Sequence, residues 1–239
     1  EGALAPYPGA DVSAIPAGAY DADRYWFGTK IIAMGIGRRL DAPQLGGLRD
    51  LTDPSVAGRV VLPTPLYSGS AAYLMAALTQ SPDFGWPFYE ALARNDAMSV
   101  RGNGKVLWAL ASGRADYGLI VDFMAIDAAV EGSPIDYAAP EDAFVAISEP
   151  VAVVAGSPNE ATARLFIDFL LSKDGAEMAV DQGYMPARRD VRPPIGFPNT
   201  VAPLLAPDLA WAITVDDANK ARFRDLFGEP VFDEGGRGE

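Results

Sequence analysis

The chain has 239 residues, 49% of them hydrophobic, which is enough for one large or two small globular domains. Its 19 basic and 32 acidic side chains give a net charge of −13, which argues against a nucleic-acid or anionic-membrane surface, because both favour Lys and Arg. The sequence has no Cys and no His, which excludes Ser-His-Asp and Cys-His catalysis and ordinary zinc or His-based metal sites. No apolar run reaches about 18 residues, so we expect no membrane span, and we find no signal peptide.

The first segment, residues 1–19, is rich in Pro, Gly and Ala and starts without a preceding strand or helix signal. The chain therefore looks as though its beginning has been removed. The aromatic run Tyr25-Trp26-Phe27-Gly28 follows, and the apolar run Ile31–Ile36 predicts a strand. Trp26 and Phe27 either pack in a core or form an aromatic wall of a ligand cleft, and the sequence leaves both interpretations open.

The segment Arg59–Leu78 predicts a strand, a loop of small residues and a helix. Val60–Leu62 is long enough for a buried strand, and Pro63 and Pro65 stop any helix there. Tyr67-Ser68-Gly69-Ser70 then precedes an amphipathic helix whose buried side we expect to carry Ala71, Leu74, Met75 and Leu78. Free N–H groups and the helix dipole make such a helix start a site for anions. The alternative is that Ser68 or Ser70 only caps the helix.

Two later loops are further candidates for ligand contact. Arg101-Gly102-Asn103-Gly104-Lys105 precedes a predicted helix and is either a plain turn or a loop that faces a ligand; it lacks the spacing of a Walker motif. Asp116–Val121 predicts a strand, and Asp122 follows at its carboxyl end, where ligands of open α/β sheets bind. Asp122 is predicted either to meet a cationic or hydroxyl group of a ligand or to be the N-cap of the next helix.

The remaining predicted elements alternate between strands and helices, which indicates an α/β fold. Strands are expected at Ile135–Ala138 and in Ala143–Val154, where Ser148-Glu149-Pro150 splits two apolar runs. The expected helices or helix-like turns are Leu48–Val56, a helix around Phe88 and Leu92, Asn159–Leu171, Asp174–Gln182 and Asp216–Phe227. For Asn159–Leu171 the spacing predicts that the inner face of the helix carries Ala163, Phe166, Ile167 and Leu170. A frayed polar tail is expected at Asp233–Glu239.

Several stretches together resemble the extracellular solute-binding proteins of bacterial ABC transporters, in the branch of ferric-ion, phosphosugar and aminoalkylphosphonate binders. They cover roughly residues 1–190. The matching stretches are Glu1–Tyr7, Tyr25–Gly28, Leu51–Val60, Ser68-Gly69-Ser70-Ala71, Gly113–Gly118, Phe166–Gly175 and Gly183-Tyr184-Met185-Pro186.

The resemblance implies an α/β, two-lobed fold of the type II periplasmic-binding-protein kind, with one lobe incomplete because the family has another lobe-forming segment before the first matching stretch. It implies a remnant of lobe 1 and a first hinge strand at 1–36, lobe 2 at 37–143, and a return hinge strand with C-terminal helices packing on lobe 1 at 144–239. It also implies a monomeric, non-enzymatic carrier in the periplasm or outside the cell. Its partners would be a small anionic solute and a membrane permease, without nucleic acid, cofactor or metal.

Within that resemblance, the expected ligand is a phosphonate or a phosphorylated compound held between the lobes. Its contacts would come from Tyr67, Ser68, Gly69, Ser70, Asn103, Lys105, Asp122, Tyr25 and Trp26. Ferric binders of the family carry paired tyrosines where this chain has Phe123-Met124, which disfavours iron. The alternatives are an Fe(III) carrier of the same family, a hydrolase that uses two carboxylates, and a sensor or structural domain on the same fold.

Overall fold

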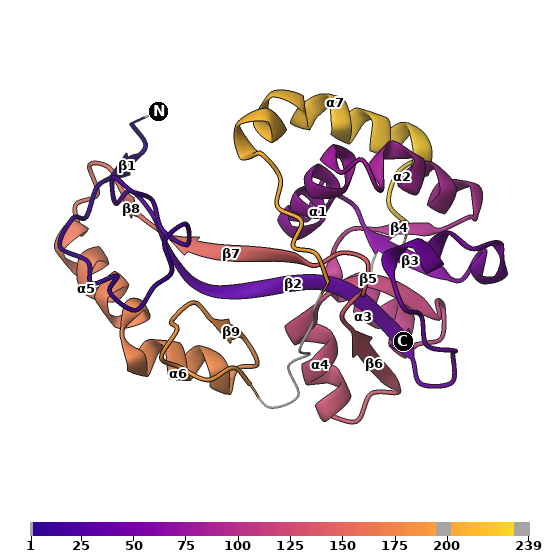
Figure 1. The fold of residues 1–239 in the computed structure, drawn as a ribbon, viewed down its shortest axis with the longest axis horizontal. Coiled ribbons are helices and arrows are strands. Elements are labelled where there is room, and N and C mark those ends of the chain that lie inside the picture. The colour runs from indigo at the N-terminus through magenta and orange to yellow at the C-terminus, as the bar shows by residue number, and fades with distance from the viewer. Residues whose placement is uncertain (1, 195–201, 232–239) are drawn as a thin grey trace. The chain divides into compact units, whose positions relative to one another are not determined.

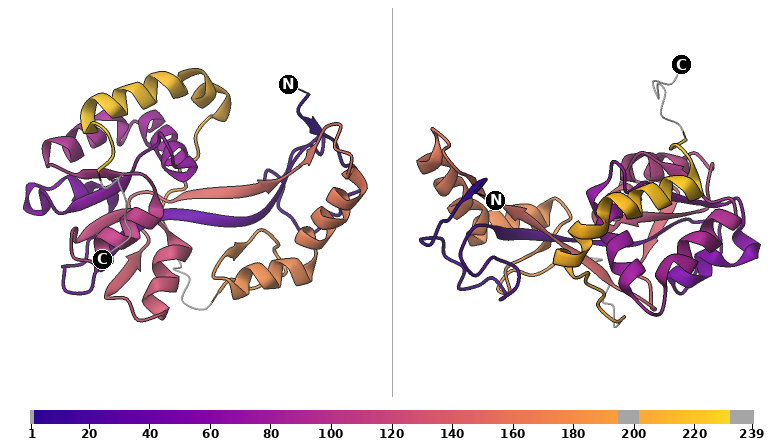
Figure 2. Two further views of the ribbon diagram at one scale, coloured as in Figure 1. Left: turned by 180° about the vertical axis from the view of Figure 1, so that it is seen from behind. Right: turned by 90° about the horizontal axis from the view of Figure 1, so that it is seen from above.

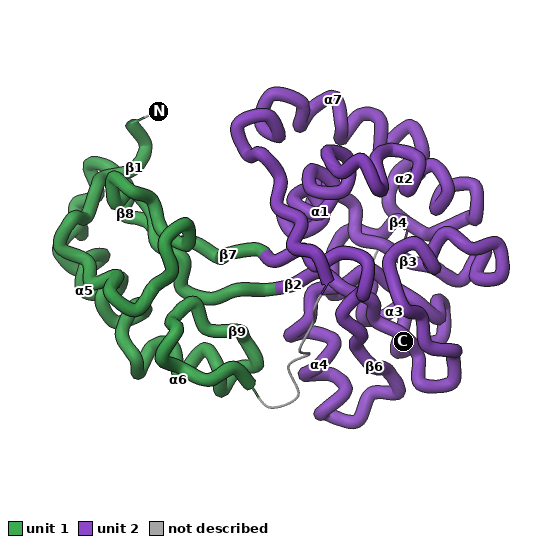
Figure 3. The backbone as a smooth tube through the Cα atoms, viewed as in Figure 1, with its two compact units in different colours: residues 1–32, 147–197 green, residues 33–146, 198–239 purple. Residues whose placement is uncertain are grey.

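The computed structural model describes residues 2–194 and 202–231, and it divides the chain into two compact units. Unit 1 consists of Glu1–Ile32 and Ile147–Phe197, and unit 2 of Ala33–Ala146 and Pro198–Glu239 (Figure 3). Each unit is therefore built from two separate stretches of sequence. The predicted tail Asp233–Glu239 lies outside the described residues. In the described part of the chain, no helix combines the length and apolar character needed to cross a bilayer.

The centre of unit 2 is a mixed sheet (Figure 1) with the strand order β4-β3-β5-β2-β6. Its strands are β4 (Met98–Val100), β3 (Val60–Pro63), β5 (Tyr117–Val121), β2 (Phe27–Arg39) and β6 (Ile135–Ala138). β3 runs parallel to β4 and to β5, whereas β2 is antiparallel to β5 and β6. The strands predicted from the apolar runs are confirmed, and the three-residue strand β4 adds one that the sequence pattern did not indicate.

Helices connect the parallel strands of unit 2, as parallel pairing requires. They are α1 (Gly69–Gln80), α2 (Gly85–Arg94), α3 (Asn103–Ala111) and α4 (Asp122–Val130), with the short 3-10 helices η1 (Leu48–Thr52) and η2 (Pro54–Val56) before β3. The predicted inner face of α1 is confirmed, since each of its four residues is at most 4% exposed: Ala71, Leu74, Met75 and Leu78.

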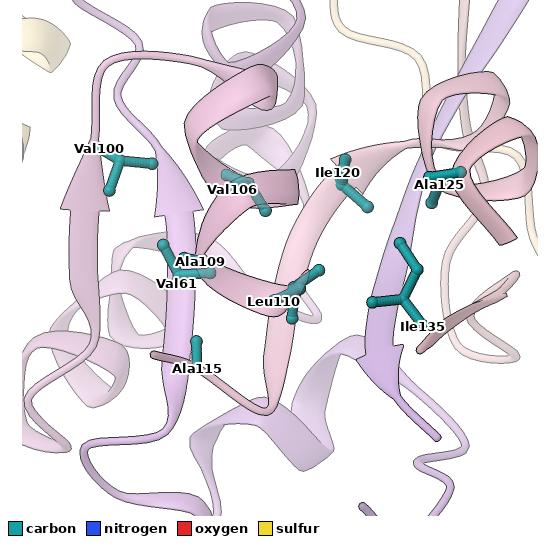
Figure 4. Close-up of a cluster of buried hydrophobic side chains, with 10 residues drawn as sticks. Val61, Val100, Val106, Ala109, Leu110, Ala115, Ile120, Ala125 and Ile135 are labelled. Carbon is teal, nitrogen blue, oxygen red and sulfur yellow. The ribbon is translucent and has the colours of Figure 1, made fainter. Parts of the chain in front are cut away.

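The core of unit 2 joins β3, β4, β5, β6, α3 and α4 through short aliphatic side chains. Figure 4 shows this cluster, whose members include Val61, Val100, Val106, Leu110, Ile120 and Ile135. Gly118 in β5 has no room for a side chain, because a Cβ there would lie 2.7 Å from Val106 Cγ1 and 3.1 Å from Val61 Cγ1. The glycine thus lets α3 pack directly on the sheet.

The helix α7 (Leu209–Phe227) lies along α1 and α2 (Figures 1 and 2) and belongs to unit 2. Phe223 is 1% exposed and meets the ring of Tyr89 edge to face at 5.9 Å. We expected all of 144–239 to pack on lobe 1, but this aromatic contact attaches α7 to α2 in unit 2. The helix also begins seven residues before the predicted Asp216, because the Asp208 side chain caps it by accepting from the backbone N–H of Ala210 at 2.9 Å.

In its described residues, unit 1 contains two small sheet segments and two helices. β1 (Leu4–Ala5) pairs with β8 (Val153–Val154), and β9 (Met185–Pro186) pairs with the first half of β2. The helices are α5 (Glu160–Leu171) and α6 (Lys173–Asp181). Phe27 is 1% exposed and packs against Tyr7 edge to face at 6.4 Å, so the core interpretation of this aromatic residue is confirmed.

Two predictions for unit 1 are wrong. On α5, Ile167 is 1% exposed but Phe166 is 57% exposed, because no described element packs over that side of the helix. The strand β7 (Val145–Val151) runs through Ser148-Glu149-Pro150 instead of being split there. Proline is tolerated because β7 pairs only with β2 among the described strands, which leaves one side without a hydrogen-bonded neighbour.

Candidate functional site

The candidate site lies in unit 2, where three neighbouring parallel strands end and three helices begin. The loop with Ser68 follows β3, the loop with Gly102 follows β4, and α4 follows β5 directly. Because β4, β3 and β5 are parallel neighbours, their carboxyl ends share one edge of the sheet. In open α/β sheets this is the edge at which ligands bind.

Hydrogen bonds join the three strand ends through two serines and one asparagine. Ser68 Oγ lies 3.1 Å from Ser70 Oγ, and Asn103 Nδ2 donates to Ser70 Oγ at 3.0 Å. Asn103 Oδ1 accepts from the backbone N–H of Val121 at 3.3 Å. Since a backbone N–H can only donate, this last bond fixes which way the Asn103 amide is turned. The sequence prediction named all three side chains, and the structure brings them together.

The capping interpretation of Ser68 is also observed, because its Oγ accepts from the backbone N–H of Ala71 at 3.3 Å. Ser68 is 9% exposed and so is mostly enclosed by its own loop. Ser70 is half-buried and lies within the first turn of α1 rather than at its cap. A hydroxyl that already accepts from Asn103 keeps its own proton to donate.

The N-termini of the helices at this edge of the sheet offer backbone N–H groups. No acceptor among the described residues takes the N–H groups of Gly69 and Ser70, the first two residues of α1. At α3, Gly102 is the N-cap and supplies no capping side chain. A Cβ built on Gly69, Gly102 or Gly104 would meet nothing within 4 Å, so open space adjoins both helix starts. Each helix start carries about half a positive charge.

Basic side chains add to this positive potential in a chain of net charge −13. Lys105, in the first turn of α3, has no ion pair with a carboxylate in the part of the chain that the structure describes. Its ammonium lies 6.0 Å from the ring centre of Trp108. The Arg101 guanidinium lies 4.6 Å from the ring centre of Tyr67, which is 54% exposed. The predicted residue Tyr67 is thus at the surface beside a cation.

Asp122 is the first residue of helix α4, and the N-cap of this helix is Val121. The alternative that Asp122 is the N-cap is therefore wrong. Asp122 is 1% exposed, and its Oδ1 accepts from the N–H of Phe123 at 2.8 Å. Burial raises the pKa of the Tyr137 phenol well above its usual value, and the nearby negative charge of Asp122 raises it further. Asp122 therefore meets neighbouring protein groups rather than solvent.

The two other predicted contacts, Tyr25 and Trp26, belong to unit 1. Tyr25 is 40% exposed, and its backbone N–H donates to Asp21 Oδ2 at 3.2 Å. Trp26 is half-buried, and its carbonyl accepts from the N–H of Asp21 at 3.0 Å. These two bonds define a turn that leads into β2.

Sequence reasoning did not assign a role to Arg101 or Tyr137. Arg101 could have been found from its place one residue after β4, next to the glycine loop. Tyr137 gave no signal, because its proximity to Asp122 arises only when β6 joins the sheet. No group of three or more carboxylates that could hold a metal ion occurs among residues 2–194 and 202–231. The side chains that meet at this edge are two hydroxyls and an amide, and the first turn of α3 adds the cation Lys105, a set that suits an acceptor-rich ligand.

Residues 14–185 match the family of bacterial extracellular solute-binding proteins. An uncharacterized protein of Haemophilus influenzae is 30% identical over 140 residues, which are 56% of this chain and 40% of that relative. The chain's match thus spans less than half of the length of this curated relative.

Solved structures of three carriers show the same fold. The apo ferric ion-binding protein A of Pasteurella haemolytica has a TM-score of 0.77 at 18% identity, covering 93% of this chain and 75% of its own. A periplasmic thiamin binding protein has a TM-score of 0.81 at 17% identity, covering 95% and 74%. The substrate-binding protein of an ABC transporter from Agrobacterium tumefaciens has a TM-score of 0.78 at 15% identity, covering 93% and 74%.

Proposed function

Because the chain belongs to the bacterial extracellular solute-binding proteins, we propose that it is the solute-binding component of an ABC importer and that unit 2 binds a small anionic solute. The proposed solute is a phosphonate or a phosphorylated compound. The observation that carries this proposal is the hydrogen-bonded group of Ser68, Ser70 and Asn103 at the shared edge of β3, β4 and β5.

The chemistry of this edge favours an anion. The N–H groups of Gly69 and Ser70 point out of the first turn of α1, and such groups bind phosphate oxygens directly. The Ser70 hydroxyl can donate a further bond because it accepts from Asn103. Lys105 supplies a full positive charge from the first turn of α3. Hydrogen bonds to an ionised ligand are roughly twice as strong as neutral ones.

An Fe(III) site is supported less well by the same residues. Fe(III) prefers hard oxygen ligands such as phenolates and carboxylates. The two positions where ferric binders carry tyrosines hold Phe123 and Met124 here, and the nearest carboxylate in the sequence, Asp122, is 1% exposed. Ferric-ion and thiamin binding, which describe the solved neighbours, are therefore competing outcomes for the experiment.

The proposed carrier works in the periplasm or outside the cell and delivers its solute to a membrane permease. In this role it binds its solute without chemical change. The contributions of Tyr25 and Trp26 stay predictions, and their test is the effect of Tyr25→Ala and Trp26→Ala on the affinity measured below.

Isothermal titration calorimetry with 2-aminoethylphosphonate, glucose 6-phosphate and inorganic phosphate tests the proposal. The sharpest variants are Gly104→Glu and Gly104→Ala, because both side chains enter open space and only one brings a negative charge. We expect Gly104→Glu to abolish binding of the anion and Gly104→Ala to keep it with unchanged folding. The double variant Ser68→Ala/Ser70→Ala should weaken binding at least tenfold, since each charge-assisted bond is worth about 1.5–3 kcal/mol.

Unchanged affinity in both Gly104→Glu and the serine double variant would place the anion elsewhere. Binding of Fe(III) or thiamin without any of the three anions would contradict the anionic solute and leave the carrier role intact. Absence of all binding, with turnover of a glycoside substrate, would favour the hydrolase alternative.

A further inference from the structure

A second pocket lies entirely within unit 2, between α1 and α7, and no predicted site residue other than Gly69 contributes to it. Its volume is about 270 Å³. Its walls come from one side of each helix: Gly69, Ala72, Tyr73, Met75, Ala76, Leu209, Ala212, Ile213, Asp216 and Asn219.

Most of this wall is apolar. Small side chains of α1 and α7, such as Ala72, Ala76 and Ala212, leave the space open, while Met75 is 1% exposed at its inner side. For scale, an apolar cavity of about 150 Å³ holds benzene. The pocket between α1 and α7 thus has room for a ring with a short substituent.

One polar side chain in the wall has no protein partner among the described residues. Asn219 is 9% exposed, and its amide makes no hydrogen bond with any residue of the described ranges. A ligand group that bonds to this amide replaces the water that can reach it, so the expected gain is that of one net hydrogen bond. Because the amide both donates and accepts, its best complement is a carboxamide or a hydroxyl.

The pocket carries little net charge. Asp216 Oδ2 accepts from Lys220 Nζ at 2.6 Å on the same helix, and the carboxylate and the ammonium offset each other. A neutral ligand therefore fits better than an anion or a cation. This distinguishes the pocket from the strand-end site, where Lys105 has no ion pair with a carboxylate of the described residues.

Contacts with both α1 and α2 fix the position of α7 beside the pocket. At one end, Gln80 and Asp208 exchange two hydrogen bonds: the Asp208 N–H donates to Gln80 Oε1 at 2.9 Å, and Gln80 Nε2 donates to the Asp208 carbonyl at 3.4 Å. Toward the other end, Phe223 is packed on Tyr89. At the rim, Leu209 is 55% exposed and Ile213 is 78% exposed, apolar surface that a bound molecule would cover.

We propose that this pocket binds a small neutral molecule with an apolar ring and one carboxamide or hydroxyl group, which bonds to Asn219. The pocket shares only Gly69 with the anion site, and the proposal does not depend on the proposed transport role. A molecule of this class occupies the space between Ala76 and Ala212 and covers Ile213.

Methyl NMR with benzamide and cyclohexanecarboxamide as probes tests the proposal on the whole chain. We expect saturable shifts of the Met75, Leu209 and Ile213 methyl signals. Asn219→Leu should weaken binding about three- to tenfold, as expected for the loss of one net hydrogen bond. Ala212→Phe, at a half-buried wall position, should abolish the shifts by filling the space. Circular dichroism melting checks that each variant folds.

Asp217→Ala is the matched control, because Asp217 is exposed on α7 and is not part of the wall. It should bind both probes as the unaltered chain does. Adding 2-aminoethylphosphonate should not displace either probe, so failure of the anion site and failure of this pocket are read separately. The proposal is overturned if neither probe gives saturable shifts up to its solubility limit, or if the folded Ala212→Phe variant keeps them.

Discussion

Units 1 and 2 use the same kinds of amphipathic helix, but they bury them to different extents. In unit 2 the predicted face of α1 is enclosed, with Leu74 at 2% exposed. In unit 1, α5 buries Ile167 at 1% but leaves Leu165 at 70% and Phe166 at 57%. The comparison teaches that helical spacing locates the apolar residues of a helix, while the number of layers packed on it decides which of them are buried.

The largest expected contrast is between core truncations in the two units. Leu110→Ala in the unit 2 cluster should lower the free energy of unfolding by about 2–5 kcal/mol, because Leu110 is 0% exposed and its removal leaves a cavity. Leu165→Ala on α5 should change it by less than about 0.5 kcal/mol. Urea unfolding followed by circular dichroism measures both. Equal losses of unfolding free energy in the two variants would mean that the side of α5 that carries Leu165 is covered in solution.

At Gly175 the packing of unit 1 is as tight as that of unit 2, and this would break the comparison. A Cβ on Gly175 would lie 2.1 Å from the Phe169 carbonyl oxygen, and backbone cannot move aside easily. We therefore expect Gly175→Ala to cost about 1–3 kcal/mol, despite the better helix propensity of alanine. The measurement is the urea midpoint, with Gly104→Ala, at a helical glycine that adjoins open space, as a control for glycine loss. If Gly175→Ala raised the urea midpoint, this would contradict the close packing of Gly175 against Phe169 at the junction of α5 and α6.

Alkaline pH should destabilise unit 2 through Tyr137. Burial and the charge of Asp122 raise its folded pKa above the ordinary value of 10.0, so above that pH the unfolded chain loses a proton that the folded chain keeps. The stabilisation is complete below pH 10.0 and falls by about 1.4 kcal/mol per pH unit until the folded pKa is reached. Tyr137→Phe should remove this part of the slope in urea titrations between pH 9 and 11.5, roughly the range of phenol ionisation.

At neutral pH the same variant gives a check. The Tyr137 hydroxyl is buried and has no hydrogen-bond partner among the described residues, so its removal should be neutral or slightly stabilising. A clear loss of stability at pH 7 would show that the hydroxyl is bonded in solution. An unchanged slope at high pH would show that the phenol ionises in the folded chain as it does in the unfolded chain.

The smallest expected effect concerns the cap of α1. Ser68→Ala removes the acceptor for the Ala71 N–H and should cost about 1 kcal/mol, whereas Ser68→Gly should cost only a few tenths. Thermal unfolding of both variants measures the difference. Two variants of equal stability would indicate that Ser68 is positioned for a ligand rather than for the helix.

Much of the fold follows from local sequence pattern. Val60–Leu62 and the face of α1 were predictable because short apolar runs and helical spacing are local signals. β4 was missed because three residues carry no period, and β7 was split because Pro150 is read as a break when the strand's neighbours are unknown. The early start of α7 depends on the Asp208 side-chain cap, which helical spacing alone does not reveal.

The candidate site was predictable as a set of residue types but not as an arrangement. Ser70 and Asn103 are 33 positions apart and meet only because β3 and β4 are parallel neighbours. Their bond to each other, and the bond from the Val121 N–H, cannot be read from either loop alone. The burial of Asp122 likewise depends on α4 and on Tyr137 of β6, which local pattern does not place.

The division of each unit between two stretches of sequence has a consequence for synthesis on the ribosome. Ala33–Ala146 forms one continuous stretch that contains all three parallel strands with their helices, so these can assemble as soon as it has emerged. Unit 1 must wait for α5, α6 and β9, since Phe27 packs in one cluster with Ile167 and Leu171. The nascent chain should therefore expose the apolar side chains around Phe27, a target for chaperones, until α5, α6 and β9 have emerged.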